Sequence, residues 1–237
     1  MLKGRDFWQI PISSSYSWNM RKLLQLRIVA YRFVEWKEGA GVWKFGGNRY
    51  SAAAVWSEIR PKQEKKEWHR LVWSSLCIPK HAMITWMAIL DRLPTMDRLL
   101  TWGIIVDGIC KLCQVEPETR DHLFCGCNFS KGVWRTILQI CGLNRRVDAW
   151  SEELVWAIQG FKGKALNSVI LRLAWRAFIY HIWRERNRRM HGQHPEDHDQ
   201  LVEHIRSDVR IRLNGLKRIS NDLINCRVYQ NWCLQVE

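Results

Sequence analysis

Four residues near the middle of the chain, Cys110, Cys113, His122 and Cys127, follow the spacing C-x2-C-x8-H-x4-C. Thiolates and an imidazole are ligands that zinc prefers, and four protein ligands leave no open coordination position. The spacing therefore predicts a closed structural zinc site, which organises a fold and does not activate water. A site of this kind favours a binding or scaffolding role over catalysis.

The oxidation state of the cysteines depends on the cellular compartment of the protein. Residues 1–8 lack the apolar core of a signal peptide, so we expect a nuclear or cytoplasmic protein that is not secreted and whose eight cysteines are reduced. A disulfide framework is the alternative, because the cysteine count is even. Cys77, Cys141, Cys226 and Cys233 have no partner at metal-ligand spacing and are interpreted as small buried hydrophobic residues.

The composition is that of a soluble globular protein. Hydrophobic residues make up 47% and charged residues 25% of the 237 residues, enough for one large or two small domains. The 15 tryptophans are unusually many, and most are expected to anchor the core. The best apolar stretch, residues 165–183, contains Arg172 and Arg176, so a membrane span is not expected.

The net charge of +14 is unevenly distributed along the chain. Residues 1–109 carry 17 basic and 9 acidic side chains, residues 110–161 carry 6 of each, and residues 162–237 carry 14 and 8. The flanks, and not the zinc segment, would therefore attract phosphates. The alternative is a surface charge that only keeps the protein in solution.

Apolar periodicity predicts a mainly α protein, a helical domain with a small zinc knuckle and a C-terminal helical extension. The expected elements are an amphipathic helix over 17–36, a hairpin near 42–50 among glycines, a largely buried helix over 81–93, a short helix between Thr95 and Gly103, and a helical pair over about 168–190 and 196–219. The charged run 62–67 is interpreted as a solvated connector. We expect domains at 1–60, 61–140 and 141–237.

The usual catalytic constellations are missing from the sequence, so we expect no enzyme. The chain contains no Asp-Asp pair of the kind a polymerase palm uses, and its carboxylates are scattered among basic residues. His81 follows Lys80 but has no carboxylate or nucleophile motif beside it, and is interpreted as a residue at the start of a helix.

Residues 68–134 resemble the reverse-transcriptase zinc-binding domain of plant LINE-type (non-LTR) retrotransposons. The resemblance rests on Trp68, Leu71–Trp73, Pro79–His81, Trp86, Arg92–Thr95, Asp97–Leu99, Trp102–Gly103, Cys110–Cys113, Glu118–Thr119, Asp121–Phe124, Cys127, Phe129 and Val133–Trp134. The flanks around Phe7–Trp8, Ser17–Trp18, Leu23–Arg27 and Ile182–Asn187 are similar to the same elements. Two departures are Cys125, where the family has a phenylalanine, and the glycine-rich stretch 39–49, which lacks the family's aromatic pattern.

The resemblance implies a non-catalytic accessory module, a C-terminal fragment of the retrotransposon polyprotein, that binds zinc and helps a reverse transcriptase hold template RNA or target DNA. It favours Cys127 over Cys125 as the fourth ligand. A structural or protein-interaction module, or a remnant without a role, is the alternative. The residues expected to contact nucleic acid are Lys80, Arg92, Arg98, Arg184, Arg186, Arg188 and Arg189.

Overall fold

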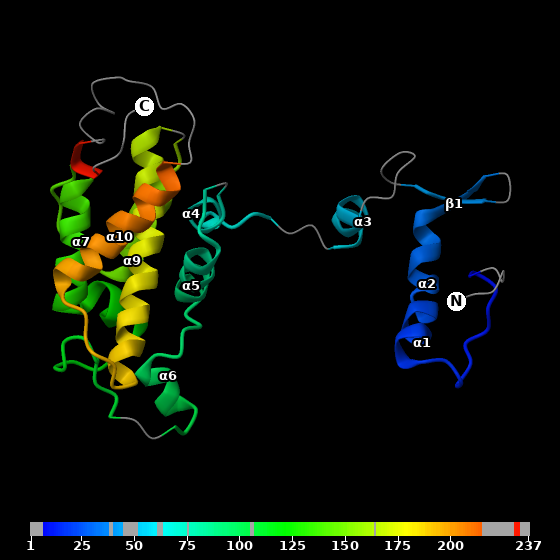
Figure 1. The fold of residues 1–237 in the computed structure, drawn as a ribbon, viewed down its shortest axis with the longest axis horizontal. Coiled ribbons are helices and arrows are strands. Elements are labelled where there is room, and N and C mark those ends of the chain that lie inside the picture. The colour runs from blue at the N-terminus through cyan, green and yellow to red at the C-terminus, as the bar shows by residue number, and fades with distance from the viewer. Residues whose placement is uncertain are drawn as a thin grey trace. The chain divides into compact units, whose positions relative to one another are not determined.

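The structure is a computed structural model that describes residues 7–37, 40–44, 52–60, 64–74, 76–104, 107–163, 165–214 and 230–232. The fold is mainly helical, as predicted, and the two strands among these residues form one antiparallel hairpin in which Val34 pairs with Trp43 and Lys37 with Ala40. In order, the elements are α1 Trp18–Gln25, α2 Arg27–Ala30, η1 Tyr31–Phe33, β1 Val34–Lys37, β2 Ala40–Trp43, α3 Ala52–Ile59, α4 His69–Val72, α5 Pro79–Ile89, α6 Met96–Thr101, η2 His122–Gly126, α7 Asn128–Ile140, α8 Trp150–Gly160, α9 Leu166–Met190 and α10 His198–Leu213 (Figure 1).

The chain divides into two compact units, residues 1–64 and residues 65–237. One hydrophobic core runs through the longer unit from Leu71 to Trp232 and is continuous across residue 140. The predicted domain boundaries at 60 and 140 stay a prediction. Within the described residues, no helix is both long enough and apolar enough to cross a bilayer.

The shorter unit has a small core made by α1 and the hairpin. Ile10, Leu24 and Val34 are buried there. The guanidinium of Arg27 donates hydrogen bonds to the carbonyl oxygens of Phe7 and Trp8, at 2.9 and 3.0 Å, and ties the preceding segment to the helix. Side-chain donors that satisfy carbonyls outside a helix or sheet in this way hold irregular backbone in place.

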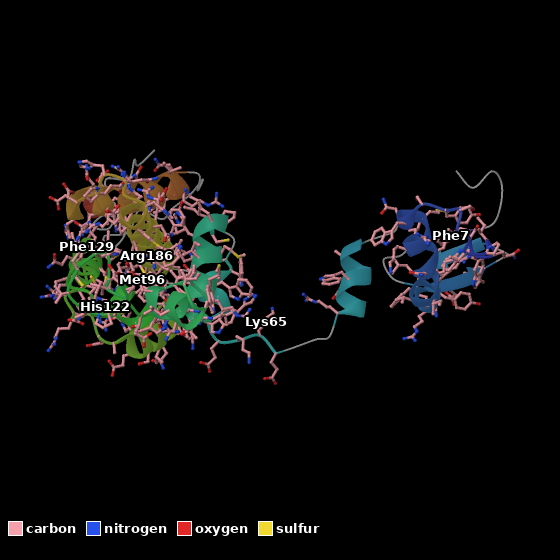
Figure 2. The ribbon with its side chains drawn as sticks, turned by 90° about the horizontal axis from the view of Figure 1, so that it is seen from below. Phe7, Lys65, Met96, His122, Phe129 and Arg186 are labelled. Atoms are coloured by element: carbon pink, nitrogen blue, oxygen red, sulfur yellow. The ribbon has the colours of Figure 1, made fainter. Side chains whose placement is uncertain are left out.

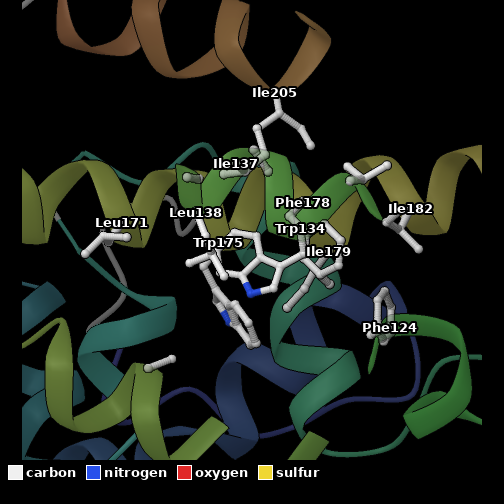
Figure 3. Packing of buried hydrophobic residues seen from close by; sticks show 14 of the residues in the cluster. Phe124, Trp134, Ile137, Leu138, Leu171, Trp175, Phe178, Ile179, Ile182 and Ile205 are labelled. Atoms are coloured by element: carbon white, nitrogen blue, oxygen red, sulfur yellow. The ribbon is translucent and has the colours of Figure 1, made fainter. Parts of the chain in front are cut away.

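The longer unit is built around α9, which is buried along most of its length because α5, α7 and α10 pack on it (Figure 1). Aromatic side chains fill the space between α7 and α9. The ring of Trp134 lies 5.2 Å from that of Trp175, edge-on, and 5.0 Å from that of Phe178 (Figure 3). Aromatic pairs at these distances add to the stability that burial of their surface provides.

Several expected details are wrong. The helix predicted over 17–36 is interrupted at Leu26 and ends at Phe33, because Val34 and Trp36 pair with β2 instead. The hairpin therefore lies earlier in the chain than the predicted range 42–50. Residues 45–51 fall outside the described part of the chain. Five tryptophans are buried, but another five are exposed, so tryptophan is not mainly a core residue among the described residues.

The helix expected over 81–93 begins at Pro79, where its missing N–H costs nothing, and ends at Ile89. It is buried on one face only. The buried face carries His81, Ala82, Thr85 and Ala88, whereas Met83 is 48% exposed. Three of the four, Ala82, Thr85 and Ala88, are small and permit the close approach of α9.

The predicted C-terminal helical pair corresponds to α9 and α10. Both ends of α9 and the start of α10 lie within two residues of the predicted bounds. The predicted end of the second helix, residue 219, falls in residues 215–229, outside the described part of the chain. The sequence did not anticipate separate helices at α7 and α8. Asp197 caps α10 and, with Gln200, forms a capping box. Gly103 follows the end of α6 and has a φ of +77°, a conformation that favours glycine.

Candidate zinc site and basic surfaces

Two ligands of the predicted zinc site lie in a tight turn. Ile109 and Pro117 form an isolated antiparallel bridge that closes the turn at its base. The N–H of Gln114 donates to the carbonyl oxygen of Cys110 at 2.8 Å, and Gln114 has a positive φ of 57°. The backbone reversal brings the sulfur of Cys113 next to that of Cys110, which is why two intervening residues suffice between them.

The other two ligands flank a single π-helical turn, η2, a distortion that is common at functional sites. His122 opens this turn, and Cys127 follows it directly, with its N–H donating to the His122 carbonyl oxygen at 2.6 Å. A Cβ atom at Gly126 would lie 3.1 Å from Nδ1 of His122, so any other residue here would push this imidazole from its place by a few tenths of an ångström. The x4 gap of the motif is therefore spanned by one wide turn.

The four side chains meet with ligand atoms that all lie within 4.8 Å of one another. Sγ of Cys113 lies 3.3 Å from Nε2 of His122. Tetrahedral zinc, with bonds of about 2.0–2.3 Å, separates such ligand atoms by about 3.5–3.8 Å. Three sulfurs and one nitrogen at these spacings fit a structural zinc ion. The carboxylate of Glu116, 3.1 Å from Nδ1 of His122, leaves Nε2 as the ligand atom.

Cys127 stands at the N-terminus of α7, where backbone N–H groups favour an anion. A hydrogen bond from the Cys110 thiol, together with the N–H groups of Ser130 and Phe129, lowers the pKa of Cys127 to about 5, although burial opposes the shift. The same hydrogen bond raises the pKa of Cys110. One thiolate is thus favoured at this position even before a cation contributes.

Cys125 is not part of the group. It is buried in η2, and its sulfur is absent from the set of ligand atoms that converge. Burial raises its pKa, which keeps the thiol neutral. All six cysteines in the described part of the chain are free of disulfides.

Comparison with known families gives one match. Residues 50–134 match the family model described as zinc-binding in reverse transcriptase, and the matched segment contains all four converging ligands. This segment carries the features of a reverse-transcriptase zinc-binding domain. Searches of curated proteins and of solved structures gave no match.

The arginines near the end of α9 do not form a free basic surface. Arg186 is 2% exposed, and its guanidinium donates to both carboxylate oxygens of Glu118, with a shortest distance of 2.7 Å. Glu118 is fully buried and also accepts a hydrogen bond from the N–H of Met96 at 3.0 Å. Figure 2 shows Arg186 among Met96, His122 and Phe129. The pair joins α9 to the zinc knuckle and to the start of α6.

Arg189 makes a second link. It donates to the carbonyl oxygen of Leu112, inside the zinc turn, at 3.1 Å and to the carboxylate of Glu185 at 2.7 Å. Its guanidinium lies 4.7 Å from the centre of the Phe129 ring. Arg186 and Arg189 are called the arginine clamp below. Buried Arg186 has no surface to offer a phosphate.

Arg184 and Arg188 share one acidic partner. Both form ion pairs with the carboxylate of Glu196, Arg184 at 2.9 Å and Arg188 at 3.1 Å. Each arginine side chain is about one third exposed. Phosphate contact by Arg184, Arg188 and Arg189 stays a prediction. If they make such contacts, they do so while paired with carboxylates of their own chain.

The three basic residues expected before the knuckle do not form one group. Lys80 lies in the first turn of α5, with its amine 4.8 Å from the Tyr180 ring, and Arg92 follows the last turn of the same helix. Arg98, on α6, pairs with Asp91 and lies over the Trp102 ring. Their role in binding stays a prediction.

Sequence reasoning missed a basic cleft between α4 and α8. The cleft has a volume of about 470 Å³ and is lined by four cations, Lys65, Lys66, Arg70 and Lys162, and, among the described residues, by one carboxylate, Glu67. Burial and the charge of Arg70 lower the pKa of nearby Arg172. None of the four cations has an ion-pair partner among the residues that the structure describes.

Lys65 and Lys66 belong to the run that the sequence suggested was only a connector. The signal that could have identified the cleft was an unbalanced charge beside an aromatic residue, since Trp73 also lines it and is 39% exposed. Lys162, almost a hundred residues later, could not have been assigned to it from spacing.

Proposed function

We propose that this chain is a non-catalytic zinc-binding module that helps a reverse transcriptase hold nucleic acid, and that it derives from the polyprotein of a plant LINE-type retrotransposon. The zinc ion would be held by the four converging ligands and would keep the knuckle folded. The match of residues 50–134 to the zinc-binding family supports the first half of this proposal. We expect the module to act in the nucleus or cytoplasm.

The basic cleft carries the second half. Four cations without carboxylate partners in the described structure attract phosphates, because each neutralised phosphate releases condensed counterions from the nucleic acid. Trp73 at the same cleft offers an exposed aromatic face on which an unpaired base can stack. A basic groove combined with an aromatic platform is the usual arrangement for binding single strands without sequence preference, so we expect template RNA to bind here before duplex DNA.

The test measures binding of the full chain to single- and double-stranded RNA and DNA by fluorescence anisotropy over a salt series. The cleft variant replaces all four cleft cations by glutamine, K65Q/K66Q/R70Q/K162Q. We expect weaker binding to every sequence and a salt slope reduced by up to about 0.7–0.9 for each phosphate that the variant no longer neutralises. A second variant, Trp73→Ala, should weaken single-strand binding more than duplex binding.

The matched control removes the same number of charges elsewhere, in K22Q/K37Q/R206Q/R210Q, where Lys37, Arg206 and Arg210 already pair with carboxylates. Equal losses of affinity in both variants would attribute binding to net charge and contradict the cleft assignment. If wild-type protein bound no nucleic acid at low salt, the nucleic-acid function would be wrong.

A protein-interaction module is the second candidate, and one observation favours it. In the shorter unit, α1 and the residues that follow it expose apolar side chains, with Trp18 at 65%, Leu26 at 58% and Ile28 at 78%. Contiguous exposed apolar surface marks interaction sites, and a reverse transcriptase is the partner we propose. Replacing Leu26 and Ile28 by serine should then abolish binding to the polymerase and leave RNA binding unchanged.

A further inference from the structure

A second group of metal-ligating side chains lies in the longer unit, away from the zinc knuckle. It consists of His81 on α5, His181 on α9 and Asp208 on α10, and is called the histidine cluster below. Their ligand atoms lie within 4.8 Å of one another. Nε2 of His181 is 2.6 Å and Nε2 of His81 is 3.4 Å from the same oxygen, Oδ2 of Asp208. Spacing could not reveal this group, since its members are far apart along the chain.

Burial leaves the two imidazoles few alternatives. His81 is 1% and His181 is 3% exposed, whereas Asp208 reaches solvent with 24% of its side chain. Nε2 of His81 is buried and has no hydrogen-bond partner among the residues the structure describes. The nearest carboxylate oxygen, Oδ2 of Asp208, is already within hydrogen-bond distance of His181. Buried polar atoms in folded proteins are nearly always satisfied, so this nitrogen is available to a ligand that the described residues do not supply.

We propose that the histidine cluster binds a divalent transition-metal ion such as Zn²⁺ through Nε2 of both histidines and a carboxylate oxygen of Asp208. Two imidazoles and one carboxylate are a ligand set that zinc accepts, with the remaining position left to water. Tetrahedral metal–ligand bonds of about 2.0–2.2 Å separate neighbouring ligand atoms by about 3.3–3.6 Å. The 3.4 Å separation fits, and rotation of the partly exposed Asp208 carboxylate widens the 2.6 Å one.

The neighbours hold both rings in position. The ring of Tyr180 stacks on His81 at 4.4 Å, and the ring of His204 stacks on His181 at 5.7 Å. The nearby charges oppose a cation: Lys80 lies over Tyr180, and Arg184 is within 3.1 Å of His204, although Glu196 neutralises Arg184. This site is therefore weaker than the three-thiolate site at the knuckle.

The position of the cluster gives the ion a structural consequence. His81 belongs to the segment that matches the zinc-binding family, whereas His181 and Asp208 lie beyond its end at residue 134. An ion at the cluster would join the matched segment to both C-terminal helices. With zinc at the knuckle as the first metal cross-link, this ion would be a second one, and it would connect α5, α9 and α10.

The test counts metal per chain after saturation with Zn²⁺ and removal of loosely held ions. We expect two equivalents in the wild-type protein and one in Asp208→Asn, which changes a partly exposed group and keeps its shape. Cys113→Ser should retain the cluster ion and lose the knuckle ion. His204→Gln, which alters a ring that stacks on the cluster without belonging to it, is the matched control and should retain two equivalents.

Substitution by Co²⁺ tells the two sites apart, because only the knuckle gives thiolate-to-cobalt charge transfer. Asp208→Asn should keep that band and lose the second equivalent. A wild-type protein that saturates at one equivalent, or an Asp208→Asn variant that keeps two, would overturn the proposal. Neither result depends on nucleic-acid binding, so the outcome is separate from that of the proposed function.

Discussion

The arginine clamp and the basic cleft are both made of basic residues that look alike in the sequence, yet they differ in what their charges face. Arg186 and Arg189 point inward to Glu118, Glu185 and the carbonyl oxygen of Leu112. The cations of the cleft have no carboxylate partner in the described structure and line a hollow. A basic run therefore predicts nucleic-acid contact only where its charges are unpaired.

The largest effect should come from the metal, because the clamp contacts a knuckle that we propose zinc keeps folded. Removing zinc, or changing Cys127→Ser, should disorder residues 108–127, since for structural zinc the binding free energy, on the order of 10 kcal/mol in small fingers, is folding free energy. Hydrogen exchange of the knuckle amides measures this.

Cys125→Ser is the matched control, because Cys125 is a buried cysteine of the same turn outside the ligand group. It should keep the metal. Full retention of zinc by the Cys127 variant, with loss from the Cys125 variant, would contradict the ligand assignment.

The next effect concerns the clamp itself. Arg186→Met leaves the carboxylate of Glu118 buried without its partner, and removal of one member of a buried ion pair costs about 3–5 kcal/mol. We expect a correspondingly lower free energy of unfolding in urea. The double variant Arg186→Met/Glu118→Gln should recover part of that loss, because no unpaired charge remains.

If Arg186→Met instead kept its stability and lost RNA binding, the assignment of Arg186 to the clamp would be wrong. The double variant distinguishes the two roles, since a recovered free energy of unfolding cannot replace a guanidinium that binds phosphate.

The difference between the zinc site and the arginine clamp shows which contacts can be predicted from the sequence. The convergence of the four candidate zinc ligands could be predicted because they lie within 18 residues, and the turns between them are set by local spacing. The pairing of Arg186 with Glu118 spans 68 residues and depends on how α9 packs, which periodicity does not specify. The same holds for His81, which lies 3.4 Å from the carboxylate of Asp208 on a helix far along the chain.

A smaller effect on stability is expected at the cleft. Because its cations have no partners to lose in the described structure, the cleft variant should change the free energy of unfolding by no more than about 0.5 kcal/mol for each substitution. Its RNA affinity should fall at the same time. Clamp variants should show the opposite pattern, with stability lost first, so thermal melts and anisotropy measured on the same samples compare the two regions directly.

The smallest effect is expected for Arg184 and Arg188, which share the partly buried carboxylate of Glu196. Each is about one third exposed, and partly exposed ion pairs contribute about 0–1 kcal/mol because solvent screens them. Arg184→Gln/Arg188→Gln should therefore leave the melting temperature nearly unchanged. The decisive measurement is the salt slope for RNA. A lower slope would place these arginines with the cleft as phosphate-binding groups, whereas an unchanged slope would place them with the clamp, because charges already committed to Glu196 release no counterions from RNA.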